Sequence, residues 1–258
     1  MPVELTFEAY GDGPPLIILH GLMGQARNWA TAAKVFGADY RTLAADLRNH
    51  GGSPWSQGMT YEAMADDVAA LVERTGPPAC IIGHSMGGKV AMVLALKYPE
   101  LVEKLVVVDI SAIRHTFSPF FGYFEAMLNL DLSAITRRSQ ADKLLADAIT
   151  DHAERAFLLL NLSSSADTGL SWKPNLQELY DSLPDILDWP EHLFDFQYHG
   201  PVMFVAGGNS PYIQETHKPD IKRLFPAVQH SVVEEAGHWV HAEKPKEFHA
   251  TVSAFLQS

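Results

Sequence analysis

The sequence predicts an α/β fold in which helices cover both faces of a mostly parallel sheet. Four short segments, residues 16–19, 79–82, 105–108 and 202–205, are almost entirely apolar. A strand that is apolar on both sides belongs to a sheet that is covered on both faces, and such sheets are mostly parallel. Segments with helical spacing separate these runs, as the connections of a parallel sheet require.

Further elements are expected at both ends of the chain and between the central runs. Shorter runs predict strands at residues 3–7, 42–45 and 230–233. Residues 245–256 repeat apolar side chains with helical spacing and predict a closing helix that packs against the sheet.

Two helices are predicted beside the central strands. Residues 61–73 have helical spacing and follow Thr60, a residue type that caps helix N-termini. Residues 86–98 are followed by Pro99, and a helix usually stops there because the residue before a proline avoids the helical conformation.

The alternation of strands and helices stops between residues 112 and 198. Apolar residues follow helical spacing over 145–159 and again over 176–183, where an asparagine precedes the stripe as an N-cap. We therefore predict a core made of residues 1–111 and 199–258, with an inserted helical cap at residues 112–198 over a pocket.

Composition limits the classes of partner. The chain has 258 residues, 47% of them hydrophobic, which suffices for one large core and argues against disorder. With 19 Lys and Arg against 31 Asp and Glu, the formal net charge is −12. Such a surface repels phosphates and anionic lipids, and the densest basic pair is Arg137-Arg138. We expect neither nucleic acid nor membrane as a partner.

The cysteine content and the N-terminal residues indicate the cellular compartment in which the protein is expected. Cys80 is the only cysteine, so neither an intrachain disulfide nor a cysteine-based zinc site can form. The first residues lack a basic segment followed by an apolar one, and no apolar run is as long as a membrane span. These features favour a soluble cytoplasmic protein. The sequence predicts no oligomeric state.

One serine lies on a predicted tight turn between a strand and a helix. The motif Gly83-His84-Ser85-Met86-Gly87-Gly88 directly follows the run 79–82 and directly precedes a helix. Such a turn strains the backbone, so the residues two positions either side of Ser85 must be small, and both are glycine. The turn lifts the Ser85 hydroxyl above the sheet and predicts a nucleophile. The alternative is a glycine-rich turn without chemistry.

A serine hydroxyl needs a base within hydrogen-bond reach, and position selects among 12 histidines. His238 lies between the last predicted strand and the last predicted helix, where a loop projects it over the sheet edge at which Ser85 is expected. His241 follows three residues later, but no third ligand accompanies the pair, so we predict no metal site. We assign His241 to local hydrogen bonding or to the surface.

The base needs a carboxylate that holds its tautomer and stabilises its charged form. The run 105–108 ends in Asp109, whereas the run 202–205 is followed by Asn209 and by no acid before Glu215. Because an amide cannot neutralise an imidazolium, we predict that Asp109 is the acid. The alternative is that Asp109 caps a turn at the strand end.

A developing oxyanion needs backbone N–H donors. One is expected from Met86, which follows the nucleophile at the positive end of its helix. The other is expected from Leu22, in the turn His20-Gly21-Leu22-Met23-Gly24, because glycine permits close approach of the backbone.

The wall of a substrate pocket is expected to be aromatic, although aromatic residues serve hydrophobic cores at least as often. The candidate substrate-binding residues are His20, Trp29, Phe117, Phe121, Trp189, Tyr212 and Trp239.

Together these stretches resemble a known family. Residues 16–24, 83–88 and 237–238 are similar to those of the α/β-hydrolase superfamily, and the resemblance covers nearly the whole chain. The order of serine, acid and histidine is also the one that this fold uses. Asn209 departs from the superfamily, many members of which have an acid at that position.

More narrowly, residues 46–53, 83–89, 207–212 and 237–245 resemble the small bacterial YbfF-type esterases. The resemblance implies an α/β-hydrolase fold with a helical cap, no cofactor, and hydrolysis of short-chain acyl esters, with acyl thioesters as a second class. It also implies that the acid follows the earlier strand, which agrees with Asp109. The loop 46–53 is expected to shape the core without taking part in catalysis.

The sequence therefore predicts a serine carboxylesterase that cleaves a small-molecule acyl ester through an acyl-enzyme. Dehalogenases and epoxide hydrolases of this fold need an aspartate in place of Ser85. Cofactor-free perhydrolases, C–C hydrolases and peptidases use the same kind of triad and stay open as alternatives. A ligand-binding receptor with little turnover is the alternative from a different class of protein.

Overall fold

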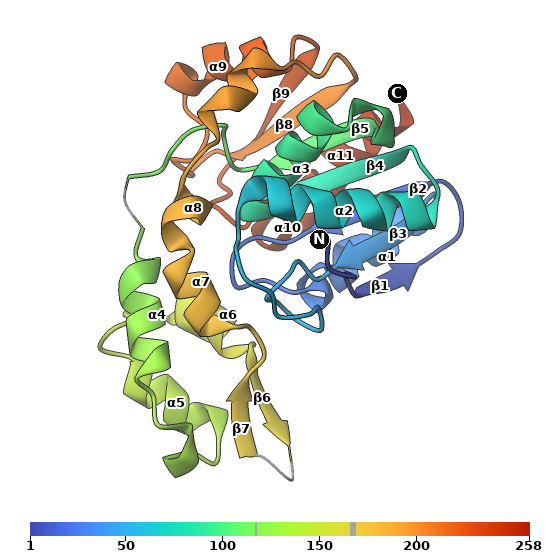
Figure 1. Cartoon of the computed structure of the whole chain (residues 1–258). Coiled ribbons are helices and arrows are strands. Elements are labelled where there is room, and N and C mark those ends of the chain that lie inside the picture. The colour runs from blue at the N-terminus through green and yellow to red at the C-terminus, as the bar shows by residue number, and fades with distance from the viewer. Residues whose placement is uncertain (117, 166–168) are drawn as a thin grey trace.

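A seven-stranded sheet forms the centre of the molecule (Figure 1). The computed structural model describes residues 1–258 except for Phe117 and residues 166–168. The strands are β1 (Phe7–Tyr10), β2 (Pro15–Leu19), β3 (Arg41–Ala45), β4 (Ala79–His84), β5 (Val102–Val108), β8 (Val202–Gly207) and β9 (Val228–Val233).

The order of the strands confirms the predicted fold class. They lie in the order β1-β3-β2-β4-β5-β8-β9, and each neighbouring pair is parallel except β1 with β3. The carboxyl ends of β2, β4, β5 and β8 therefore meet at one edge of the sheet, where the loops after these strands can build a common site.

Helices cover both faces of the sheet. The pair α2 (Tyr61–Thr75) and α3 (Met86–Lys97) packs on one face, and α1 (Ala30–Phe36) packs with α11 (Pro245–Gln257) on the other. Residues of β2 alternate between the two cores, with Ile17 on the α2 side and Ile18 on the α1 side. The remaining helices of the core are α9 (Lys218–Leu224), α10 (Val240–Glu243) and the 3₁₀ helices η1 (Ala26–Trp29), η2 (Pro99–Leu101) and η5 (Glu215–His217).

The boundaries of the three helices predicted in the core agree with the structure to within two residues. The Thr60 side chain accepts a hydrogen bond from the N–H of Ala63 and caps α2 as predicted. Helix α3 ends at Lys97, two residues before Pro99. These ends are local features, so the sequence determines them well.

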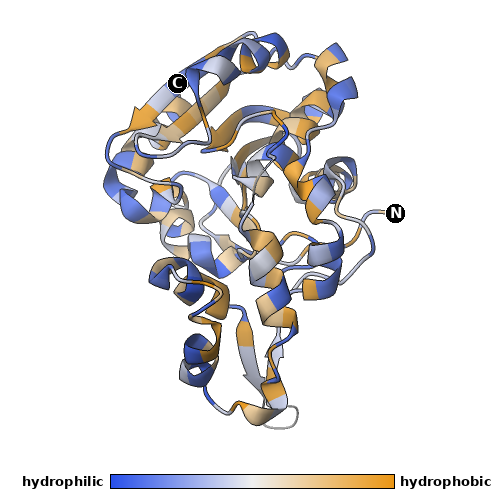
Figure 2. Cartoon of the chain, turned by 90° about the vertical axis from the view of Figure 1, so that its left-hand side faces the viewer, coloured by the Kyte–Doolittle hydropathy of each residue, from blue (hydrophilic) through white to orange (hydrophobic). Residues whose placement is uncertain are grey.

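Residues 112–198, which we call the inserted segment, lie outside the sheet between β5 and β8 (Figure 1). In Figure 2 its helices carry both hydrophobic and hydrophilic patches, and their buried side chains, such as Phe124 and Leu179, join the core on the α2 side. Its elements are α4 (Phe120–Leu128), η3 (Leu132–Ala134), α5 (Arg138–Leu145), α6 (His152–Leu159), β6 (Leu162–Ser165), β7 (Gly169–Trp172), α7 (Leu176–Asp181), α8 (Leu183–Leu187) and the 3₁₀ helix η4 (Glu191–Asp195).

The inserted segment differs from its prediction in three places. The stripe over 176–183 is divided between α7 and α8. The stripe over 145–159 is not one helix, because the Asp151 carboxylate accepts the N–H groups of Ala153 and Glu154 at 2.8 and 2.9 Å and begins α6 afresh. The hairpin of β6 and β7 was not predicted, since its serine-rich strands contain no apolar run. The predicted N-cap is confirmed at Asn175, whose side chain accepts the N–H of Glu178.

The first strand also differs from its prediction. We expected a strand at residues 3–7, but β1 spans Phe7–Tyr10 and pairs antiparallel with β3. Its residues are exposed or half-buried because β1 lies at the edge of the sheet. An edge strand of this kind needs no apolar run, so the hydrophobic pattern gave the wrong boundary.

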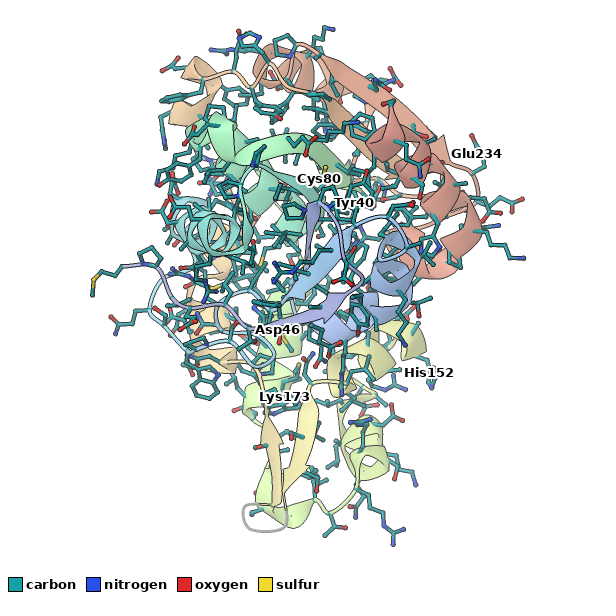
Figure 3. All side chains as sticks on the ribbon, turned by 90° about the vertical axis from the view of Figure 1, so that its right-hand side faces the viewer. Tyr40, Asp46, Cys80, His152, Lys173 and Glu234 are labelled. Carbon is teal, nitrogen blue, oxygen red and sulfur yellow. The ribbon has the colours of Figure 1, made fainter. Side chains whose placement is uncertain are left out.

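The single cysteine is structural. Cys80 lies on β4 inside the core (Figure 3), and burial raises the pKa of its thiol to about 12. A thiol held in its neutral form is a poor nucleophile. In the part of the chain that the structure describes, no helix has the combination of length and apolar character that crossing a bilayer demands.

Candidate active site

Ser85 lies on a strained turn between β4 and α3. Its φ of 52° and ψ of −120° are unfavourable for a residue with a side chain. A Cβ atom on Gly83 would lie 2.2 Å from the carbonyl oxygen of Gly87, and one on Gly87 would lie 2.5 Å from that of His20. The turn therefore requires glycine at both positions, as the motif predicted, and it holds Ser85 at the carboxyl edge of the sheet.

Asp109 and His238 form a hydrogen-bonded pair at the same edge. The distance from His238 Nδ1 to Asp109 Oδ2 is 2.7 Å. Because a carboxylate can only accept, Nδ1 carries the proton and Nε2 is the free nitrogen of the ring. Asp109 is fully buried and also accepts hydrogen bonds from the N–H of Gly207 at 3.0 Å and from the hydroxyl of Ser210. These donors fix the carboxylate and compensate its burial.

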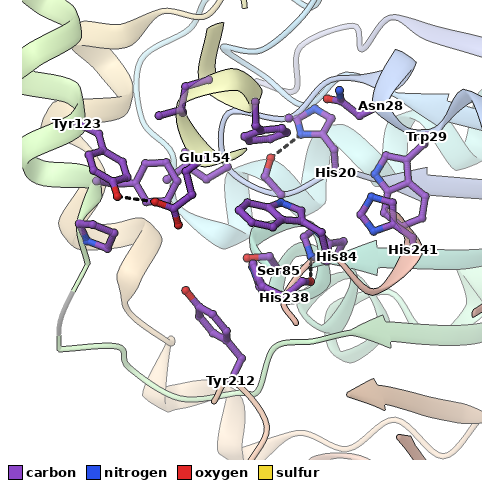
Figure 4. Close-up of a pocket in the computed structure, with 18 residues that line it drawn as sticks. His20, Asn28, Trp29, His84, Ser85, Tyr123, Glu154, Tyr212, His238 and His241 are labelled. Carbon is purple, nitrogen blue, oxygen red and sulfur yellow. Dashed lines mark hydrogen bonds between the residues drawn. The ribbon is translucent and has the colours of Figure 1, made fainter. Parts of the chain in front are cut away.

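Two neighbours hold His238, one at its ring and one at its backbone. Tyr212 stacks on it with ring centroids 4.2 Å apart, and the backbone carbonyl of His238 accepts a hydrogen bond from His84 Nε2 at 2.9 Å. Ser85 and His238 line one cavity (Figure 4). Within the described part of the chain they make no direct hydrogen bond, and contacts of this kind often tighten only when substrate binds.

Hydrogen bonds hold the turn after β2 both before and after Leu22. His20 accepts the N–H of Leu47 at Nε2 and donates from Nδ1 to the carbonyl of Gly21, at 3.0 and 2.8 Å. Met23, with a φ of 61°, donates its N–H to Nε2 of His50 at 3.1 Å. Both imidazoles act as acceptors, so both must stay neutral. Burial lowers the pKa of His20 to about 4 and that of His50 to about 3.

The inserted segment also contacts this turn. The amide of Asn161 donates to the carbonyl of Met23 at 2.7 Å, and Asn161 is fully buried. The conformation around Leu22 thus depends on residues from two distant parts of the chain. The loop 46–53 has the structural role that we predicted for it, since it contributes His50 and the buried ion pair of Arg48 with Asp67 at 2.6 Å.

The cavity above Ser85 has a volume of about 160 Å³. Four of the predicted pocket residues line it, together with Ser85, His238 and Leu22: His20, Trp29, Tyr212 and Trp239. The opposite wall comes from the inserted segment, which contributes Pro119, Phe120, Tyr123, Glu154, Phe157 and Leu158. Tyr123 donates a hydrogen bond to the Glu154 carboxylate across this wall (Figure 4).

Comparison with known proteins identifies the family. A family model described as "alpha/beta hydrolase fold" matches residues 14–245. The chain belongs to the α/β hydrolase family. Among its relatives, Esterase YbfF of Escherichia coli is 33% identical over 241 residues, which cover 93% of this chain and 92% of that protein. The resemblance to YbfF-type esterases found in the sequence is therefore confirmed.

Two further similarities extend over almost the whole α/β hydrolase chain. The "sn-1-specific diacylglycerol lipase ABHD11" of Mus musculus is 42% identical over 266 residues, covering 99% of this chain and 86% of that protein. A solved structure titled "Marine microorganism esterase" has a TM-score of 0.94 and 34% identity, and covers 98% of this chain and 99% of the other. Relatives named as esterases and lipases support hydrolase activity for this chain.

Three predicted pocket residues of this α/β hydrolase need a correction or a qualification. Phe121 is 41% exposed and meets Tyr180 edge-on at 6.3 Å, so it does not line the cavity with Ser85. Trp189 is buried beside Phe194, also away from that cavity. Both side chains pack against other aromatic residues away from the cavity. From the sequence, aromatic residues that pack in this way cannot be told from those that line a pocket. Phe117 lies outside the described residues.

The interpretation of His241 as a surface or locally hydrogen-bonded residue also needs correcting. Its ring stacks on Trp29 with centroids 3.9 Å apart, and its buried Nδ1 has no hydrogen-bond partner among the described residues. Burial lowers the pKa of His241 to about 3 and holds that of His84 well below 6.5. The base proposed from the sequence, His238, therefore has neutral histidines as neighbours. Among the described residues, no group of His, Cys, Asp and Glu is arranged to hold a metal ion.

Proposed function

We propose that this α/β hydrolase is a serine carboxylesterase with Ser85 as nucleophile, His238 as general base and acid, and Asp109 as the orienting carboxylate. The observation that carries the proposal is the 2.7 Å hydrogen bond from His238 Nδ1 to Asp109, in a cavity that Ser85 and His238 both line. It leaves Nε2 as the nitrogen that exchanges protons with substrate.

The first half-reaction forms an acyl-enzyme. Ser85 Oγ adds to the ester carbonyl carbon while its proton moves to Nε2 of His238. The N–H groups of Leu22 and Met86 donate to the oxyanion. The bond between the acyl carbon and the alcohol oxygen then breaks, and His238 returns the proton to the departing alkoxide. Asp109 stabilises the imidazolium that exists between these transfers.

The second half-reaction releases the acid. Water adds to the acyl carbon of the acyl-enzyme, and His238 takes one of its protons. The bond to Ser85 Oγ breaks, and His238 protonates Ser85. Water supplies the hydroxyl group of the acid product, so the two steps need no oxidant or reductant.

We also propose that the inserted segment, residues 112–198, acts as a cap over the core formed by residues 1–111 and 199–258. Tyr123, Glu154 and Phe157 of this segment form the cavity wall opposite Ser85, which supports the proposal. A mostly apolar wall excludes water from the site and favours uncharged acyl esters over anions. Thioesters with the same acyl groups are the second substrate class.

Hydrolysis of p-nitrophenyl butyrate tests the proposed activity. We expect Ser85→Ala and His238→Ala each to lower kcat by about 10⁴-fold or more, because nucleophile and base act as a unit. Ser139→Ala, at an exposed position on α5, is the matched control and should keep full activity. Retention of wild-type turnover by Ser85→Ala would contradict the proposal.

A further inference from the structure

We propose that the acyl group and the alcohol group of the substrate occupy two separate cavities that meet at Ser85, and that the smaller one limits the length of the acyl chain. This inference rests on the proposed esterase function and names its substrate class. The products are those of the proposed reaction, a short carboxylic acid and an alcohol that is the bulkier of the two.

A second, smaller cavity adjoins the first. Its volume is about 60 Å³, against about 160 Å³ for the first cavity. The two share the walls Leu22, Ser85, Phe120 and Tyr212, so they open onto the same nucleophile. The residues that line only the second cavity include Tyr61, Met86, Lys89, Ile110, Ile186 and Leu187.

The proton transfer decides which group enters which cavity. The departing alcohol oxygen must lie next to His238, which protonates it, and His238 and Trp239 line the first cavity only. The acyl carbon is bonded to Ser85 Oγ, and its oxyanion faces the N–H groups of Leu22 and Met86. The acyl chain leaves that carbon in the remaining direction. The second cavity lies there, since it is lined by Ser85, Leu22 and Met86 but not by His238.

The two cavity volumes indicate how many atoms of the substrate each cavity can hold. One water-sized group needs about 10–15 Å³ of such space, so the second cavity has room for about four to six non-hydrogen atoms. The first cavity has room for about eleven to sixteen. An ester of a short acid with a larger, mostly apolar alcohol fits this arrangement. A long acyl chain does not fit the second cavity.

Hydrogen bonds hold in place the far wall of the second cavity, which we call the acyl cavity from here on. Lys89 is 1% exposed, and its ammonium group donates to the carbonyls of Ile113, Leu187 and Asp188 at 2.8, 3.3 and 2.7 Å. These three bonds use all three of its N–H donors and tie both ends of the inserted segment to α3. Tyr61 donates from its hydroxyl to the carbonyl of Ile186. The wall is thus pinned through its backbone, so a longer chain cannot push it outward at low cost.

The side chain of Leu187 offers a way to change the volume without removing these bonds. It is half-buried and lines the acyl cavity, while its backbone carbonyl accepts the hydrogen bond from Lys89. Leu187→Ala enlarges the cavity and Leu187→Phe fills it. Phe157→Ala is the matched control, because Phe157 lines the first cavity only.

The experiment measures kcat/KM for p-nitrophenyl esters from acetate to decanoate. We expect the wild-type value to fall by about tenfold or more between hexanoate and decanoate. Leu187→Ala should raise the octanoate-to-butyrate ratio by about tenfold, and Leu187→Phe should lower it. Phe157→Ala should leave this ratio unchanged and should raise the rate for acetates of bulkier alcohols. Ile110→Val, which removes one methyl group from the same cavity, replaces Leu187→Ala if that variant does not fold.

Two results would overturn the inference while leaving the esterase function intact. One is an octanoate-to-butyrate ratio that responds to Phe157→Ala and not to changes at Leu187 or Ile110. The other is hydrolysis of 1,2-dioleoylglycerol by the wild-type protein as fast as that of 1,2-dibutyrylglycerol. Failure of the wild-type protein to hydrolyse any ester would instead overturn the proposed function, and the inference with it.

Discussion

Asp109 fixes the tautomer of His238 through one short hydrogen bond. We expect Asp109→Asn to lower kcat by about 10⁴-fold, since an amide can donate to Nδ1 and so favour the wrong tautomer. Steady-state kinetics with p-nitrophenyl butyrate measures the loss. Asn209→Ala is the matched control, because Asn209 lies exposed in the neighbouring loop and should tolerate the change. If Asp109→Asn retained most of its activity, another group would have to orient His238.

The residues proposed for catalysis were predictable from the sequence, and those of the opposite cavity wall were not. Ser85 and Asp109 directly follow strands, His238 lies in the short loop between β9 and α10, and the carboxyl ends of parallel strands converge at one edge. Tyr123 and Glu154 belong to helices whose position depends on packing over the whole inserted segment. No local pattern distinguishes such residues from ordinary polar surface residues.

Histidines 20 and 50 were harder to interpret. A sequence pattern can place a histidine on a turn but cannot reveal that its Nε2 accepts a backbone N–H from a loop 27 residues away. The positive φ of Met23 gave no signal either, because methionine rarely adopts it. Such partners are set by tertiary contacts.

At the scale of elements, the turn between β4 and α3 is the most sensitive feature. We expect Gly87→Ala to abolish hydrolysis and to destabilise the fold by about 1–3 kcal/mol, because the new methyl group meets the backbone oxygens of Leu19 and His20 at 2.5 Å. Denaturant unfolding and ester hydrolysis measure the two effects.

Gly122→Ala is the matched control for the turn. Gly122 lies within α4, and a Cβ atom there meets nothing within 4 Å. Alanine should therefore stabilise the protein by about 0.5–1 kcal/mol, since glycine is a poor helix residue. Equal effects of the two substitutions would contradict the account of the turn.

The ends of helices were predicted correctly where a capping residue or a proline marks them in the sequence. Thr60 and Asn175 cap their helices as expected, and Pro99 follows the end of α3. The edge strand β1 and the hairpin of β6 and β7 lack such signals, because neither buries a continuous apolar face. Their positions come from pairing with other parts of the chain.

At the scale of the whole molecule, buried neutral histidines make stability depend on pH. The pKa values of His20 and His50 are lowered from 6.5 to about 4 and about 3. Between pH 6.5 and 4 the unfolded chain therefore binds more protons than the folded protein, and the free energy of unfolding falls as pH falls. Each of these two histidines contributes up to about 1.4 kcal/mol per pH unit.

Urea unfolding at pH 7.5, 6.0 and 5.0 measures this dependence in a range where most carboxylates stay ionised. His50→Gln should reduce the slope between pH 6.0 and 5.0, because it removes one of the groups that protonate on unfolding. His199→Gln is the matched control, since His199 is exposed to water in the folded protein. A wild-type stability that stays constant or rises on acidification contradicts the assignment of neutral imidazoles around the site.

Covalent labelling with a fluorophosphonate probe, followed by peptide mapping, shows whether Ser85 is a nucleophile that His238 activates. We expect a single adduct on Ser85, formed at least about 100-fold more slowly in His238→Ala because the hydroxyl has lost its base. An unreactive Ser85 in the folded wild-type protein, or labelling that is equally fast without His238, would contradict it and favour a binding protein over an enzyme.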